Sequence, residues 1–244
     1  MIHSDREDAR VELFGDNCRN LYSQEKITIK VERGRFTKTV QVRSHKRNSG
    51  KKSIIGVAGF ENAGAATNLA IALAAMANSS KWKEIVVMEM GNRYIYSKIR
   101  RFYGESMVDI DGSFHVDGVT FVPDADEDTA VRMAAREEIF LILDCGDKPD
   151  EFSTALKLCS RRILLCSLLP WKIQNVYNFL EYGATKDLWN CVLVTEGKVN
   201  RRAIGKKTGC HMKPWIFIED PFHLRVEDIK ELYRLACEEK YITN

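Results

Sequence analysis

Six short apolar segments constrain the fold of this chain more than any other feature of its sequence. They are SIIGVAG (53–59), EIVVMEM (84–90), IFLILDC (139–145), RILLCSL (162–168), CVLVTE (191–196) and PWIFIED (214–220). Apolar runs without polar alternation are typical of strands in a parallel sheet whose two faces are both covered by helices. Helices are expected between them, over residues 67–78, 94–103, 127–137, 151–159, 171–182 and 224–240. The sequence therefore predicts an α/β fold of three layers, a mostly parallel sheet flanked by helices.

The first 50 residues follow a different pattern. KITIKVERGRFTKTVQVR (26–43) alternates apolar and polar residues, which predicts a small antiparallel β-hairpin as an N-terminal appendage. RSHKRNSGKK (43–52) holds five Lys or Arg and no acid, and a solvated linker is favoured over a nucleic-acid patch because no aromatic residue is interleaved. We therefore expect an extension, residues 1–50, and one larger domain, residues 51–244. Within that domain, GSFHVDGVTFVPD (112–124) is expected to form a small antiparallel addition to the sheet.

Composition excludes several classes of protein. With 45% apolar and 29% charged residues the chain is an ordinary globular protein, and it has no apolar run of the length that spans a membrane. The first ten residues are charged where a signal peptide has an apolar core, so a cytoplasmic location is expected. Seven cysteines without a Cys-x-x-Cys pair, and five histidines without metal-like spacing, predict buried reduced thiols and no metal site.

The segment GFENAGAAT (59–67) has the spacing of a phosphate-binding loop but lacks its chemistry. Gly59 and Gly64 stand as in a Gly-x-x-x-x-Gly loop, where backbone N–H groups and a helix N-terminus hold phosphate. Lysine and a Ser or Thr should follow, to neutralise phosphate and to hold magnesium, but the chain has Ala65 and Ala66. Thr67 offers a hydroxyl one residue further on. By spacing alone, a tight strand-to-helix turn that needs glycines is the alternative.

The loss of the lysine has a definite energetic consequence. A charge-assisted contact to phosphate contributes about 1.5–3 kcal/mol, so its absence weakens binding by about one to two orders of magnitude. Glu61 adds a carboxylate inside the loop. No cofactor is expected, although backbone amides leave room for weak binding of ATP and magnesium. FLILDCGDK (140–148) ends a strand in Asp144, the position of a magnesium-shell carboxylate, or else a loop cap after a buried strand.

In the order of these segments the chain resembles the ParA/MinD-type deviant Walker ATPases of the SIMIBI class, and among them the TadZ/CpaE-like pilus-assembly proteins. The resemblance covers about residues 53–240 and implies a P-loop NTPase-like fold. Phe60 falls on the signature lysine and Ala65 on the P-loop lysine. Asp144 falls on the Walker B carboxylate, while Glu89 and Gly91 in EIVVMEMGNR lie over the acidic pair of the preceding strand. The chain is also similar to degenerate relatives in Gram-positive bacteria.

The chain departs from the family's pattern at the catalytic positions, so we expect a non-catalytic member that acts as a scaffold or localisation factor. The resemblance implies a pilus or secretion system as its context. Its partners would be proteins of an assembly, and the chain would be a monomer or a homodimer not bridged by nucleotide. The expected site is a degenerate nucleotide site without catalytic residues, formed by Gly59, Gly64, Ala65, Ala66, Thr67 and Asp144. One alternative is a weak, atypical ATPase that uses backbone amides, Thr67 and Asp144. A second is a nucleic-acid-binding module that uses the basic segments 43–52 and 196–207.

Two further expectations concern the surface. Among Trp171, Tyr177 and Phe179, at least two are expected in the core, because aromatic side chains carry much of the burial in such folds. The last helix, 224–240, has one apolar side and an acidic polar side, so it is expected to dock on the sheet and not on an anionic membrane.

Overall fold

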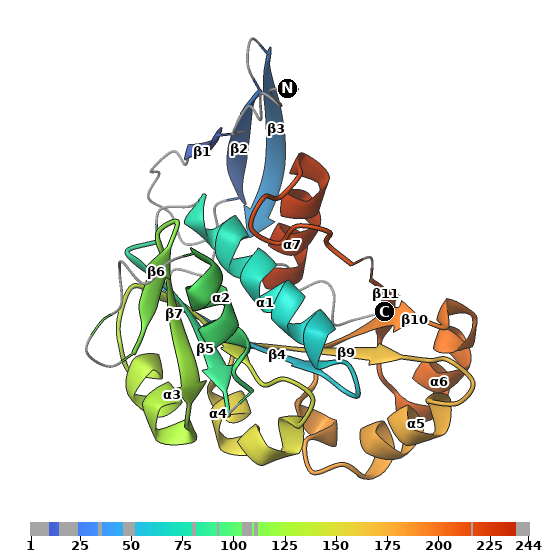
Figure 1. Ribbon diagram of the computed structural model, residues 1–244. Helices are drawn as coiled ribbons and strands as arrows, with labels where there is room; N and C mark the ends of the chain where they lie inside the picture. The colour runs from blue at the N-terminus through green and yellow to red at the C-terminus, as the bar shows by residue number, and fades with distance from the viewer. Residues whose placement is uncertain are drawn as a thin grey trace, which may run out of the picture.

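A computed structural model describes the backbone of residues 10–14, 24–33, 36–45, 52–79, 82–91, 93–103, 109, 112–215 and 217–237, with side chains from residue 52 to 236 within these ranges. Its main feature is an eight-stranded sheet in the order β11-β10-β9-β4-β8-β5-β7-β6 (Figure 1). Neighbouring strands are parallel except β6 and β7, which are antiparallel at one edge. The strands are β4 (Ser53–Gly59), β5 (Glu84–Met90), β6 (Phe114–Val116), β7 (Val119–Ala125), β8 (Ile139–Asp144), β9 (Arg161–Ser167), β10 (Cys191–Glu196) and β11 (Met212–Pro214).

Helices cover both faces of this sheet and complete three layers (Figure 1). One face carries α1 (Ala63–Asn78), α2 (Ile95–Tyr103) and α7 (Val226–Cys237). The other carries α3 (Glu127–Ala134), α4 (Ser153–Leu158), α5 (Ile173–Tyr182) and α6 (Arg201–Thr208), with short 3₁₀ turns η1 (Pro149–Phe152), η2 (Lys186–Leu188) and η3 (Lys198–Asn200). The predicted α/β fold, a mostly parallel sheet flanked by helices, is confirmed.

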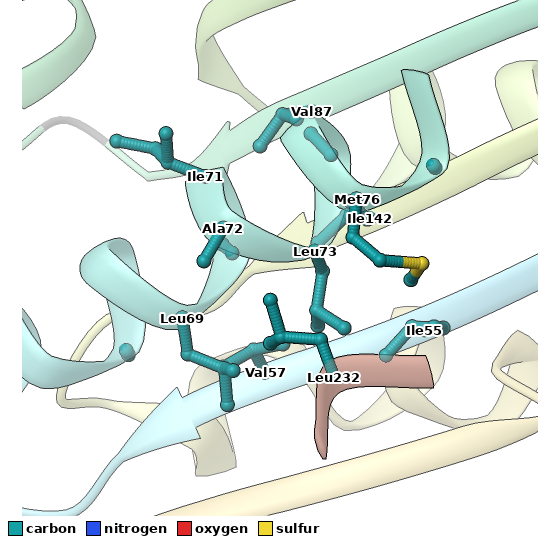
Figure 2. Packing of buried hydrophobic residues seen from close by; sticks show 14 of the residues in the cluster. Ile55, Val57, Leu69, Ile71, Ala72, Leu73, Met76, Val87, Ile142 and Leu232 are labelled. Atoms are coloured by element: carbon teal, nitrogen blue, oxygen red, sulfur yellow. The ribbon is translucent and has the colours of Figure 1, made fainter. Parts of the chain in front are cut away.

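Two apolar clusters, one on each face of the sheet, hold these layers together. In β4, Ile55 and Val57 point to the α1 side while Ile54 and Ala58 point to the other side, as the alternation of a strand requires. Helix α1 is buried along most of its length because α7 covers its outer side, and Leu232 of α7 reaches the same cluster (Figure 2). The last helix therefore docks on the body of the protein, as predicted.

The N-terminal strands form a separate antiparallel sheet in the order β1-β2-β3. Strands β2 (Gln24–Arg33) and β3 (Phe36–His45) are the predicted hairpin, and Arg33 pairs with Phe36 at its closed end. Strand β1 (Arg10–Phe14) was not predicted and pairs with β2. The predicted domain boundary at residues 50–51 and most of the basic segment 43–52 lie outside the described residues.

Several element boundaries differ from the sequence prediction for identifiable reasons. Helix α1 begins at Ala63 and not at 67, because Asn62 caps it by accepting a hydrogen bond from the Ala65 N–H. The strand predicted over 214–220 is wrong: β11 ends at Pro214, and among the described residues after it none is in a strand. The Trp215 N–H still donates to the Val194 carbonyl of β10 at 2.8 Å, but the Ile218 carbonyl oxygen accepts from the Asn68 side chain of α1 at 2.7 Å.

The segment 112–124 forms the predicted antiparallel addition. Strands β6 and β7 are joined by Asp117 and Gly118, both with positive φ (47° and 79°), which is the conformation of a tight hairpin turn. Helix α6 was not among the helices predicted from the sequence.

Candidate functional site

The candidate site lies where three central strands end side by side. Strand β8 lies between β4 and β5, so Gly59, Met90 and Asp144 end neighbouring parallel strands at one edge of the sheet. Two backbone hydrogen bonds fix the loops there, from the Gly59 N–H to the Gly146 carbonyl (2.7 Å) and from the Cys145 N–H to the Val57 carbonyl (2.8 Å). Ligands of open α/β sheets bind outside the carboxyl ends of the strands, and the predicted site residues Gly59 and Asp144 lie there.

The loop after β4 is short and closed on itself. The Asn62 N–H donates to the Gly59 carbonyl at 2.8 Å, which forms a tight turn directly before α1. The amides of Ala65 and Ala66 already donate to the Asn62 carbonyl, at 3.2 and 3.4 Å. Both alanine side chains are buried in the core, and Gly64 lies exposed in the first turn of α1. A phosphate would therefore find the Asn62, Ala65 and Ala66 amides already bonded and no cationic side chain from this loop.

Helix α5 holds the outer side of the loop. The Phe60 ring stacks on Phe179, with ring centroids 4.4 Å apart. Asn175 donates to the Glu61 carboxylate at 2.8 Å, and the Lys172 ammonium lies 3.5 Å from the Glu61 carbonyl oxygen. The loop residues Phe60 and Glu61 are thus tied to α5 within the same protomer.

A cation of the chain itself lies on the Asp144 carboxylate. The guanidinium of Arg93, in the loop after β5, places Nη2 3.0 Å from Asp144 Oδ2 and donates to the Asp144 carbonyl oxygen at 2.8 Å. Its Nη1 donates to Thr67 Oγ1 at 3.2 Å, while the Thr67 hydroxyl donates to Asp144 Oδ2 at 2.7 Å. The Asp144 side chain is fully buried and that of Arg93 is 16% exposed. The two residues that would face magnesium, Thr67 and Asp144, are therefore bonded to a guanidinium.

Two further residues complete this network. The Tyr96 hydroxyl, fully buried on α2, donates to Asp144 Oδ2 at 3.3 Å, and burial raises the Tyr96 pKa well above its usual range. Both oxygens of the buried Glu89 carboxyl accept backbone N–H groups at the start of α2, those of Ile95 (2.8 Å) and Tyr96 (3.1 Å). Glu89 therefore caps α2 from the end of β5 and orients the loop that carries Arg93.

Electrostatics favour the charged guanidinium despite its burial. Burial lowers the pKa of Arg93, but the nearby Asp144 carboxylate raises it by more, so the pKa ends above its ordinary value. Burial raises the pKa of Glu89 from 4.5, and the two N–H groups that it accepts only partly oppose that shift. Gly146 makes room for the arrangement, because a Cβ there would lie 2.7 Å from Arg93 Cδ.

These residues do not fit ATP with magnesium. The carboxylate of Asp144 and the hydroxyl of Thr67 are the groups that would face the metal, and Arg93 already neutralises the first and bonds the second. Within the described residues, no group of three His, Cys, Asp or Glu side chains is arranged to hold a metal ion. What the geometry provides is a network of hydrogen bonds among Arg93, Thr67, Tyr96 and Asp144 at the carboxyl ends of these strands, in which the buried Arg93 Nε has no partner within the described residues.

The structure brings some of the predicted site residues together and separates others. Thr67 and Asp144 are in direct contact, and Gly59 adjoins them through Gly146. Gly64, Ala65 and Ala66 belong to α1 and make no side-chain contribution to a phosphate site. Sequence reasoning missed Arg93 and Tyr96, since nothing in a single sequence pairs a loop arginine with a carboxylate 51 residues away.

Comparison with known proteins gives likenesses of structure alone. No protein-family profile and no curated protein matches the chain. A ParA family ATPase from Chlorobium tepidum TLS is structurally similar, with 10% identity and a TM-score of 0.48, over 77% of this chain and 93% of that chain. A plasmid partition protein from Borrelia burgdorferi is 15% identical with a TM-score of 0.44, over 75% of this chain and 98% of that chain.

Proposed function

We propose that this chain is a catalytically degenerate relative of the ParA/MinD-type proteins that acts as a scaffold or localisation factor for a larger assembly. The single observation that carries this proposal is the Arg93 guanidinium on Asp144, where a nucleotide-bound cation would otherwise lie. A switch that cycles on nucleotide needs an open cation site, whereas this site holds a fixed internal charge. The proposed pilus or secretion context rests on the sequence resemblance to TadZ/CpaE-like proteins.

The shape of the phosphate loop supports the same proposal. Ala65 and Ala66 bury methyl groups where a lysine and a hydroxyl residue would reach phosphate and magnesium. Phe60 contacts Phe179 of its own chain, so it offers no charge to a nucleotide held by a second protomer. Partners of such a protein would bind its surface whether or not a nucleotide is present. Within the described residues no helix is both long and apolar enough to pass through a bilayer.

Calorimetry with ATP and magnesium tests the proposal. We expect no binding tighter than about 10 μM, because the charge-assisted phosphate contact is missing and the cation position is filled. Binding below that value, with turnover that Asp144→Ala abolishes, would instead establish the atypical ATPase. The matched control is Asp147→Ala, an exposed carboxylate three residues further along, which leaves either outcome unchanged.

A second candidate function, nucleic-acid binding, is favoured by one observation on α6. This helix has four basic residues and no acidic residue, and the indole of Trp171, in the loop before α5, is 73% exposed. The basic residues are Arg201, Arg202, Lys206 and Lys207. DNA binding that weakens steeply with salt, with a slope reduced by about 1 in Lys206→Ala, would support this candidate. DNA binding whose affinity does not change with salt concentration would exclude this candidate.

A further inference from the structure

Two loops beyond the carboxyl ends of the neighbouring parallel strands β9 and β10 each present an exposed apolar side chain. Trp171, between β9 and α5, is 73% exposed, and Val199, in the turn η3 before α6, is 95% exposed. The loops are bonded to each other, because the Asn200 side chain donates to the Leu168 carbonyl at 3.1 Å and the Leu168 N–H donates to the Glu196 carbonyl at 3.0 Å. Helices α5 and α6, which follow these loops, lie side by side on the same face of the sheet (Figure 1).

The turn that carries Val199 is held in a fixed position. Gly197 begins this turn with a φ of +68°, and a Cβ there would lie 2.2 Å from the Leu168 carbonyl oxygen. Both the positive φ and the close approach require glycine, so the turn packs directly on the loop before α5. A fixed turn needs little further ordering when another molecule covers its exposed side chain, and this favours binding.

Basic side chains accompany the two exposed apolar residues. Lys198 and Arg202 are exposed, and Lys172 directly follows the indole in the sequence. Within the described residues, none of these three cations forms an ion pair. We call the five residues the α5–α6 patch: Trp171, Lys172, Lys198, Val199 and Arg202.

The carboxylates that adjoin the α5–α6 patch already have hydrogen-bond donors. Glu61 accepts from the Asn175 side chain at 2.8 Å, and Glu196 accepts from the Ser167 hydroxyl at 2.9 Å. Helix α6 adds four basic residues and no acidic residue. The charge that this surface offers to a partner is therefore positive.

We propose that the α5–α6 patch binds an acidic amphipathic segment of a partner protein. Apolar side chains of that segment would cover Trp171 and Val199, and its carboxylates would face the cations of the patch. Tryptophan and arginine are among the residue types that dominate the energy of protein interfaces, and opposite charges across an interface add specificity. This inference rests on the proposed scaffold function and names the surface and the class of partner through which that function would act.

Other occupants fit the α5–α6 patch less well. Proteins that bind single-stranded nucleic acid stack successive bases on several aromatic rings, whereas this patch has one indole and an aliphatic side chain that cannot stack. Nucleic acid and anionic lipid also bring continuous negative charge to Glu61 and Glu196, whereas a peptide places its carboxylates only where cations lie. Two-fold pairing of the patch with itself would set cation against cation.

Fluorescence anisotropy with a labelled synthetic peptide tests the proposal. The probe is an amphipathic helix of about 16 residues with Leu on one side and Glu on the other, and its control has Lys in place of every Glu. At about 0.05 M salt, we expect the wild type to bind the Glu peptide with a dissociation constant of about 100 μM or below, and the Lys peptide at least about tenfold more weakly.

Variants of the patch should change this preference. Trp171→Ser and Lys198→Glu/Arg202→Glu should each weaken binding of the Glu peptide at least about tenfold. The charge-reversed variant should in addition prefer the Lys peptide, an exchange that a general loss of structure does not produce. Val199→Ser, at a residue 95% exposed, should weaken binding without a change of charge and covers the case in which the reversed variant does not fold.

Matched control variants are available on α2, on the opposite face of the sheet. Phe102→Ser, at a residue 84% exposed, and Lys98→Glu/Arg101→Glu should bind the Glu peptide as the wild type does. Equal affinity for the two peptides, or binding that the patch variants leave unchanged, would overturn the proposal. Binding of a dT oligomer, of phosphatidylserine vesicles or of a second copy of the chain would overturn it as well, if Lys198→Glu/Arg202→Glu abolished that binding.

Repeating the titration with ATP and magnesium separates this proposal from the scaffold proposal. We expect the same affinity for the Glu peptide with and without ATP. An affinity for the Glu peptide that ATP changes would contradict the scaffold proposal and support the surface. A chain that binds neither ATP nor the Glu peptide would overturn the surface alone.

Discussion

Replacing Arg93 with methionine would remove the only guanidinium that contacts the buried Asp144 carboxylate in the described part of the chain. Asp144 has no exposed side-chain surface, and without Arg93 it would keep only neutral donors, the Thr67 and Tyr96 hydroxyls and the Gly146 N–H. Breaking a buried ion pair from one side costs about 3–5 kcal/mol, because the remaining charge is left uncompensated. For a domain of this size each kcal/mol lowers Tm by about 2–4 °C, so a decrease of about 6–20 °C is expected.

The assay is a thermal or urea melt of four chains: wild type, Arg93→Met, Asp144→Asn and the double variant. Because the double variant removes both charges, it should recover much of the loss, and the coupling energy should exceed about 1 kcal/mol. Arg136→Met is the matched control, since Arg136 pairs with Glu84 at 2.6 Å but is 53% exposed. It should cost less than about 1 kcal/mol. The network would be refuted if Arg93→Met had the same melting temperature as the wild type. It would also be refuted if the changes in unfolding free energy of the two single variants added up to that of the double variant.

Three more predictions follow from the same geometry. Burial raises the Glu89 pKa above 4.5, so the folded protein holds this proton more tightly than the unfolded chain does. In melts at increasing pH from 4.5, the stability of the wild type relative to Glu89→Gln should therefore fall. A wild type that gains stability relative to Glu89→Gln as pH rises would contradict this prediction. Gly59→Ala should destabilise the folded protein by about 2 kcal/mol or more, because the new Cβ would lie 2.0 Å from the Asn62 carbonyl oxygen. Gly64→Ala should stabilise α1 by about 0.5–1 kcal/mol, because a Cβ at that position would have no atom within 4 Å. Mass spectrometry after brief alkylation at about pH 8 should leave four buried cysteines unmodified. Burial raises the thiol pKa to about 12 for Cys159 and Cys166 and to about 11 for Cys191, and it raises the pKa of Cys145 well above its ordinary value. Rapid labelling of Cys145 would contradict that burial.

Strands were the most predictable part of the fold. The bounds 53–59, 84–90 and 191–196 match β4, β5 and β10 to the residue, because each apolar run is buried on both faces and ends in turn residues. Among the three aromatic residues near α5, Phe179 is buried and Tyr177 half-buried, but Trp171 is exposed.

Features that depend on contacts between distant residues could not be read from the sequence. After β11 the Ile218 carbonyl accepts from the Asn68 amide, which lies 150 residues away in the sequence. Helix α1 begins early because Asn62 caps it, while the glycine spacing suggested a longer loop.

The residues expected to form the site come only partly together in the structure. Asp144 and Thr67 were singled out as a remnant magnesium shell, and the structure places them 2.7 Å apart. Nothing in the sequence marked Arg93, the partner that they share, as part of the site. Only the fold brings it to the carboxylate.

Crystals grown with ATP and magnesium would test the central claim most directly. The account predicts that Arg93 stays within hydrogen-bond distance of Asp144 and Thr67, with no triphosphate in the turn between β4 and α1. A nucleotide seated in that turn, with magnesium coordinated by Thr67 or Asp144 and the Arg93 side chain displaced, would contradict it.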